Sequence, residues 1–67
     1  MKHKSQKEIK KFNDMLCIAN ICGLVKQDKI KEAVEAAQAR NINPEQFGKI
    51  ANMTDKTPQE IYKAVFE

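Results

Sequence analysis

Signals for the start of a helix recur along this chain and divide it into short segments. The runs Asn43-Pro44-Glu45-Gln46 and Thr57-Pro58-Gln59-Glu60 fit the capping box, in which an N-cap side chain and the residue three positions later satisfy each other's backbone N–H groups. Proline stands at the first helical position of both runs, where its missing N–H costs nothing. Ser5-Gln6-Lys7-Glu8 fits the same box, and Asp28 is a simpler N-cap candidate. Four starts predict four helices.

The expected helices account for most of the chain. The first runs from about Gln6 to Cys22 and ends at Gly23, because glycine tolerates the left-handed conformation of a C-terminal cap. The second spans Lys29 to Arg40, the third Pro44 to about Met53, and the fourth Pro58 to Phe66. The side chains expected to face inward are Ile30, Ala33, Val34 and Ala37, then Phe47, Ile50 and Ala51, and finally Ile61, Ala64 and Val65. No alternating strand pattern competes, so the predicted fold is all-α, a compact bundle of four short helices.

The length of the chain allows only one hydrophobic core. With 67 residues, of which 42% are hydrophobic and only four are Gly or Pro, the composition favours a folded chain over a disordered one. A chain this short buries only about 60% of the surface that its unfolded form exposes, so its stability as a monomer is expected to be marginal. We therefore expect a single domain over residues 1–67, with residues 1–5 as a basic flexible N-terminal arm.

Basic residues are concentrated near the N-terminus. Residues 1–11 hold five lysines and one glutamate, whereas the rest of the chain holds seven basic and eight acidic side chains. Such an arm attracts phosphate backbones without reading their sequence. A solvated, loose terminus explains the same charges equally well. The lysines expected to contact phosphates are Lys2, Lys4, Lys7, Lys10 and Lys11.

The residue types needed for catalysis or metal binding do not form a recognisable set. The one histidine, His3, lies in the arm, and Cys17 and Cys22 lack the spacing of a zinc site. The expectation is a non-enzymatic protein without a metal or cofactor. The uncharged run from Met15 to Val25 is too short to cross a membrane, which needs about 20 apolar residues. With no secretory signal visible, a reducing cytoplasm is the expected location.

A local pattern spans the second and third expected helices. The pattern begins with a small residue, Ala37, and a turn residue, Asn41. A buried aliphatic residue, Ile42, and two apolar anchors, Phe47 and Ile50, follow. Ala37 would let the helices cross closely, and Asn41 tolerates a positive φ. This arrangement resembles the helix-turn-helix of DNA-binding proteins over residues 33–52.

The resemblance implies a reading helix with polar side chains turned outward. Asn, Gln and Lys side chains at such positions hydrogen-bond base edges in the major groove. The residues implied are Asn43, Gln46, Lys49 and Asn52, with Glu45 beside them. Two residues depart from the pattern: Arg40 replaces an apolar residue, and Glu45 would approach phosphates.

The first expected helix is apolar around more than half of its circumference. Three short helices cover only part of such a helix, so we expect a homodimer that uses Phe12, Met15, Leu16 and Ile18 as an interface. The alternative is that the other three helices enclose this helix completely.

Three functional hypotheses follow from these features. The first is a nucleic-acid-binding regulator that uses the helix-turn-helix, the lysine arm and a homodimer. The second is a protein-binding module or inhibitor, of the phage or plasmid type, that docks through an apolar helix face. The third is a structural subunit of a larger assembly.

Overall fold

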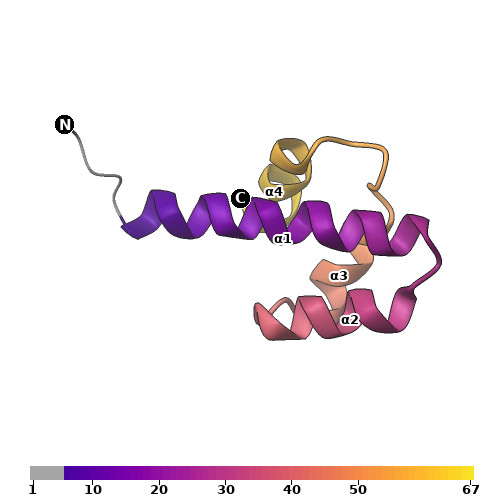
Figure 1. Ribbon diagram of the computed structural model, residues 1–67. Helices are drawn as coiled ribbons and strands as arrows, with labels where there is room; N and C mark the ends of the chain where they lie inside the picture. Colours follow the sequence, from indigo (N-terminus) through magenta and orange to yellow (C-terminus); the bar gives the residue numbers. More distant parts are fainter. Residues whose placement is uncertain (1–5) are drawn as a thin grey trace.

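The computed structural model describes residues 6–67 and forms four helices (Figure 1). They are α1 (Gln6–Lys26), α2 (Ile30–Ala39), α3 (Pro44–Ala51) and α4 (Pro58–Phe66). No strand occurs within this part of the chain. The predicted all-α fold of four helices is confirmed.

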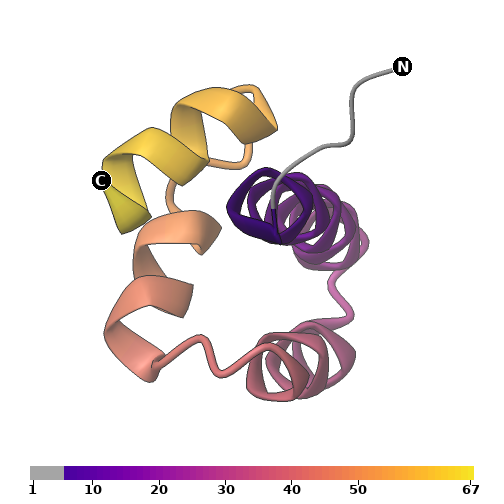
Figure 2. The same ribbon diagram turned by 90° about the vertical axis from the view of Figure 1, so that its left-hand side faces the viewer.

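Helix α1 organises the bundle, because it contacts each of the other three helices. Helix α2 runs back alongside α1, and the N-terminal turns of α1 extend past the end of α2 (Figure 1). Seen along the axis of α1, helices α3 and α4 lie on one side of it and close the bundle (Figure 2). Within residues 6–67, no other helix lies against the opposite side of α1.

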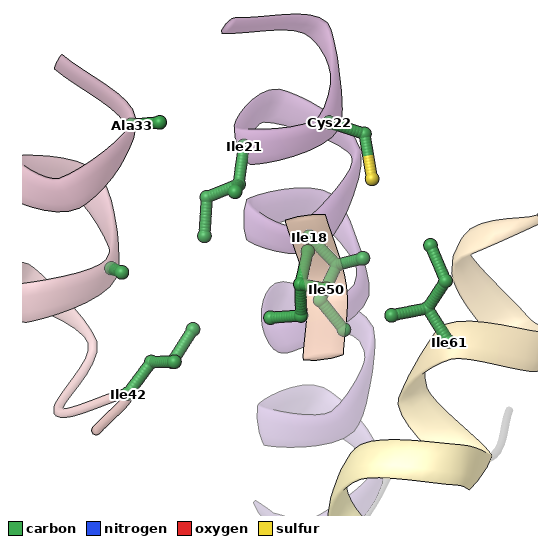
Figure 3. Close-up of a cluster of buried hydrophobic side chains, with 8 residues drawn as sticks. Ile18, Ile21, Cys22, Ala33, Ile42, Ile50 and Ile61 are labelled. Carbon is green, nitrogen blue, oxygen red and sulfur yellow. The ribbon is translucent and has the colours of Figure 1, made fainter. Parts of the chain in front are cut away.

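The core is built from isoleucines of three helices (Figure 3). Ile18 of α1, Ile50 of α3 and Ile61 of α4 are completely buried. Helix α2 contributes small residues, Ala33 and Ala37, which allow its backbone to lie close to α1. The other members of the buried cluster are Ile21, Cys22 and Ile42.

The two proline-containing capping boxes form as predicted. At the start of α3, Gln46 N donates to Asn43 Oδ1 over 2.8 Å, and Asn43 N donates to Gln46 Oε1 over 3.1 Å. At the start of α4, Thr57 and Glu60 exchange the equivalent bonds at 3.2 and 3.1 Å. The expected box at Ser5 lies outside the described residues. Helix α4 has its predicted bounds, whereas α3 ends at Ala51 with Asn52 as its C-cap, slightly earlier than expected.

The predicted end of the first helix is wrong, because α1 continues through Gly23 to Lys26. Leu24 and Val25 in the added turn pack against the core, which favours its continuation. The helix ends in a Schellman motif in which Lys29 N donates to Leu24 O over 2.8 Å and Asp28 N to Val25 O over 3.0 Å. Asp28 has a φ of 63°.

This ending also corrects the predicted start of the second helix. Asp28 adopts the left-handed conformation that ends α1, so it is not the N-cap of α2. Lys29 takes that position and makes no side-chain capping bond. Only three residues connect the two helices, and Asp28 is the one whose left-handed conformation ends α1. It is therefore not available to cap α2.

Most inward-facing predictions agree with the observed burial, and two are wrong. Ala33, Ala37, Ile50 and Ile61 are buried, and Val34, Phe47, Ala51 and Val65 are partly buried. Ile30 is 44% exposed, because it is the first residue of α2 and has no preceding helical turn to cover it. Ala64 is exposed on the outer side of α4, since Ile61 and Val65 form the inner side.

Candidate binding surfaces

A buried carboxylate joins α1 to the end of α2. Asp14 is only 7% exposed and is the one buried polar residue of the described chain. Arg40 Nη2 donates to Asp14 Oδ1, and Lys10 Nζ donates to Asp14 Oδ2 over 2.9 Å. The three side chains border an open hollow of about 340 Å³ between α1 and the end of α2. The sequence analysis did not identify Asp14; its only signal was an acidic residue among the apolar residues of the first helix.

The electrostatics of this cluster favour the ionised pair. Burial alone would raise the pKa of Asp14, but the hydrogen bonds from Arg40 and Lys10 prevail and hold this pKa below its ordinary value. The hydrogen bond to Asp14 in turn raises the pKa of Arg40. The cluster is an internal brace in which one carboxylate binds two cations, Lys10 and Arg40, so both oxygens of Asp14 are already occupied.

The turn between α2 and α3 has the conformation expected from the sequence. Asn41 has a φ of 59°, and α2 ends in a Schellman motif in which Ile42 N donates to Ala37 O over 2.9 Å. Ala37 and Ile42 are buried, so they pack as predicted. Arg40, which departs from the apolar preference of the helix-turn-helix, extends to Asp14 instead.

The polar residues expected to read bases are not equally accessible. Asn43 and Gln46 hold each other in the capping box of α3, whereas Lys49 and Asn52 are exposed and make no contact of this kind. Glu45 is also exposed. Next to these residues, α2 and α3 border a small apolar hollow of about 150 Å³, lined by Val34, Ala37, Gln38, Ile42, Pro44 and Phe47.

Two of the lysines expected to contact phosphates bind acidic side chains of the same chain. Lys10 forms an ion pair with Asp14. Lys11 Nζ lies 3.3 Å from Glu67 Oε2 and 5.2 Å from the centroid of the Tyr62 ring. Lys7 is exposed in the first turn of α1. Lys2 and Lys4 lie outside the described residues. Lys7, Lys10 and Lys11 therefore lie in the N-terminal half of α1, and two of them are paired within the chain.

Large apolar side chains are exposed along one side of α1. Ile9 is 42% exposed, Phe12 49% and Leu16 54%, and the small side chain of Ala19 continues the row. We call these four residues the apolar face of α1. Its positions on the helix lie opposite Ile18, which is buried in the core. Figure 2 shows one side of α1 against which no other helix of residues 6–67 lies.

The apolar face corrects part of the predicted interface. Phe12 and Leu16 are exposed as that prediction requires, and Met15 is partly buried at its edge. Ile18 is completely buried within its own chain, so it is unable to contact a partner. Ile9, which the prediction left out, replaces it because it lies on the same side as Phe12 and Leu16.

Residues 6–67 contain neither a candidate membrane span nor a candidate metal site. No helix there is long and apolar enough to cross a membrane, and no group of three or more His, Cys, Asp or Glu side chains is placed to hold a metal ion. The chain matches no protein-family model, and no curated protein or solved structure is significantly similar to it.

Proposed function

We propose that this chain is a small protein-interaction module, whose apolar face on α1 binds an amphipathic helix of a protein partner. The observation that carries the proposal is the exposure of Ile9, Phe12 and Leu16, about half of each side chain, in one row opposite the core. Scattered apolar residues are normal on a protein surface, whereas a contiguous row marks an interaction site.

The two free cysteines, Cys17 and Cys22, support a reducing location such as the cytoplasm.

The spacing of the exposed residues favours a helix as the ligand. Residues three and four positions apart on α1 form a straight apolar row about 15 Å long from Ile9 to Ala19, at about 1.5 Å per residue. A helix that carries its own apolar row lies along such a surface and buries both rows together. Complete burial of each large side chain contributes about 1.5–3 kcal/mol relative to full exposure, before the entropic cost of association is counted.

The proposal is tested by nuclear magnetic resonance with an isotope-labelled protein and a synthetic amphipathic helix that carries leucines at heptad spacing. The peptide is expected to shift the amide signals around Ile9, Phe12, Leu16 and Ala19 and to leave those of α3 unchanged. The variant Leu16→Lys should lose this response, because it places a charge in the centre of the apolar face. The matched control, Ala64→Lys, changes an exposed residue of α4 and should bind like the wild type.

Two results would count against an interaction site on α1. One is the absence of any response at saturating peptide in a sample that sedimentation shows to be monomeric, and the other is an equal loss of binding in Leu16→Lys and Ala64→Lys. Thermal unfolding of both variants shows whether they remain folded.

A second candidate function is nucleic-acid binding through α2 and α3. The observation that favours it is the tight turn with Asn41 at positive φ between two helices whose facing residues, Ala37 and Ile42, are buried. Lys49 and Asn52 are the exposed side chains available for base contacts. Residues 30–52 carry three basic and three acidic side chains, so phosphate attraction would depend on lysines elsewhere in the chain.

Retention on duplex DNA at low salt tests this candidate, because phosphate attraction is strongest there. If it is correct, Lys49→Ala and Asn52→Ala relax discrimination between sequences by about 1–3 kcal/mol for each lost base contact. Replacing Lys2, Lys4 and Lys7 by Ala should weaken binding to every duplex and reduce its salt dependence. An intact protein that passes through the column unretained would leave α2 and α3 with a packing role only.

A further inference from the structure

The exposed row on α1 follows the spacing of a coiled-coil seam. Ile9, Phe12, Leu16, Ala19 and Gly23 are separated by alternating steps of three and four residues, which is the spacing of the a and d positions of a heptad. Ile9, Phe12, Leu16 and Ala19 are exposed, and Gly23 is partly exposed. Helix α1 therefore carries two seams, one turned into its own core and one turned outward.

The outward seam changes in size along the helix. Its N-terminal half holds the large side chains Ile9, Phe12 and Leu16, and its C-terminal half holds Ala19 and Gly23. A ligand that fills this surface must have the opposite order, with small residues facing the first half and large residues facing the second. Helix α1 of a second copy has that order when it runs in the opposite direction.

Gly23 is the smallest residue of the seam and lies at its C-terminal end. Glycine inside a helix costs about 0.5–1 kcal/mol relative to alanine. Gly23 does not have a positive φ, and a Cβ built on it would meet no atom within 4 Å. The missing side chain of Gly23 therefore leaves room for a large side chain of a partner at this end of the seam.

We propose that the apolar face of α1 pairs with the same face of a second copy of this chain, in an antiparallel coiled coil. This inference rests on the proposed function and names its partner. Pairing a positions with d positions places Phe12 against Gly23 of the second copy and Leu16 against its Ala19. Phe12 and Leu16 each meet a small residue, and the two-fold symmetry repeats both contacts. The same register places Ile9 at the end of the seam, against the aliphatic stem of Lys26 of the second copy.

Charge complementarity supports the same direction. Glu8 precedes the seam at one end and Lys26 follows it at the other. Antiparallel pairing brings Glu8 near Lys26 of the second copy, whereas parallel pairing places equal charges side by side. Parallel pairing would also place Phe12 on Phe12 at one end and Gly23 on Gly23 at the other, so the helices would not pack closely along the whole seam.

Sedimentation equilibrium of the full chain tests the assembly. The wild type is expected to be a dimer at micromolar concentration. Leu16→Lys should raise the dimer dissociation constant by about 100-fold or more, because each dimer loses two buried leucines. A wild-type protein that sediments as a monomer would overturn the second-copy inference, while peptide binding would still decide whether the apolar face is an interaction site. A dimer that Leu16→Lys does not weaken would overturn the inference by placing its interface elsewhere.

Two glycine variants separate the interface from the stability of the chain. Gly23→Ala and Gly48→Ala each add a Cβ in open space within a helix, so both should stabilise the single chain. Only Gly23→Ala should weaken the dimer, by about 10-fold, because the added methyl groups collide with Phe12 of the second copy. Equal dissociation constants for the two variants would exclude the proposed contact at Gly23.

Disulfide trapping tests the direction of pairing in a background with Cys17→Ala and Cys22→Ala. The double variant Phe12→Cys with Gly23→Cys should form a covalent dimer on mild oxidation, because these positions are about 16 Å apart within one helix and meet only between copies. Phe12→Cys alone should remain uncrosslinked. Rapid crosslinking of that single variant would show parallel pairing and overturn the proposed geometry.

Discussion

Asp14 in the middle of α1 forms an ion pair with Arg40 at the end of α2, 26 positions further along the chain. This contact and the burial of Ile18 and Ile21 correspond to one rotation of α1 about its own axis. Successive residues of a helix turn by about 100°, so a helix that directs Asp14 towards α2 directs Phe12 and Leu16 about 160° away from it on either side. The internal brace and the exposed apolar face are therefore two consequences of one helix orientation.

Removal of Arg40 should destabilise the protein more than removal of Lys10. Arg40→Ala leaves the buried carboxylate of Asp14 with one exposed partner, and the expected loss in the free energy of unfolding is about 1–3 kcal/mol. Lys10→Ala should cost about 0–1 kcal/mol, because the Lys10 side chain is 74% exposed. Urea denaturation of both variants measures the difference.

A double-mutant cycle assigns this effect to the pair itself. Asp14→Ala combined with Arg40→Ala should be less destabilising than the sum of the two single variants, with a coupling of about 0.5–3 kcal/mol. Strict additivity would mean that the two side chains act independently, contrary to the ion pair.

The pKa of Asp14 predicts a loss of stability in acid. Burial acts to raise this pKa, but the bonds from Arg40 and Lys10 lower it below the ordinary value of 3.8. The unfolded chain therefore takes up the proton first, and the contribution of Asp14 is complete above about pH 3.8 and is lost as the pH falls through the lower, folded value. Thermal unfolding between neutral and strongly acidic pH should show this decline, and Asp14→Asn should reduce it.

Glu60 provides a comparison for the same measurement, because capping bonds with Thr57 also lower its pKa. Glu60 is exposed whereas Asp14 is buried, so Glu60→Gln should alter the acid transition less than Asp14→Asn does. A decline of equal size in the wild type and in Asp14→Asn would exclude Asp14 as its source.

Local signals predicted the starts of α3 and α4 correctly, because a capping box is contained within four residues. Asn43 and Thr57 perform the expected roles, and Asn41 adopts the expected positive φ. The end of α1 depended on contacts far along the chain, since Leu24 and Val25 are held in the helix by the core. A glycine signal alone was insufficient to end it.

The candidate site was predictable only in part. The sequence showed that α1 has more apolar surface than three short helices cover, and Phe12 and Leu16 are indeed exposed. It did not determine which side is turned outward, so Ile18 was included and Ile9 left out. That choice depends on contacts between distant residues, namely the packing of Ile18 with Ile50 and Ile61 and the pairing of Asp14 with Arg40, which no local spacing reveals.

The two residues at positive φ should respond to glycine in the opposite way from ordinary helical residues. Asp28 and Asn41 have φ values of 63° and 59°. Asp28→Gly and Asn41→Gly are each expected to raise stability by up to about 1 kcal/mol, because glycine reaches this conformation without steric strain. Gln38→Gly, in an exposed position within α2, should lower stability by about 1 kcal/mol. Denaturation midpoints that fall in all three variants would contradict the left-handed assignments.

The two cysteines should behave as inert core residues. Cys17 and Cys22 are free, and burial raises the pKa of both thiols, so the reactive thiolate is scarce at neutral pH. Their positions on α1 are about 140° apart around the helix axis, which prevents an internal disulfide. Alkylation of the native protein should therefore be slow compared with the urea-unfolded chain, and Cys22, at 8% exposure, should react more slowly than the partly buried Cys17. Rapid labelling of Cys22 in the folded protein would show that the core around Ile18 and Ile21 opens more readily than its burial indicates.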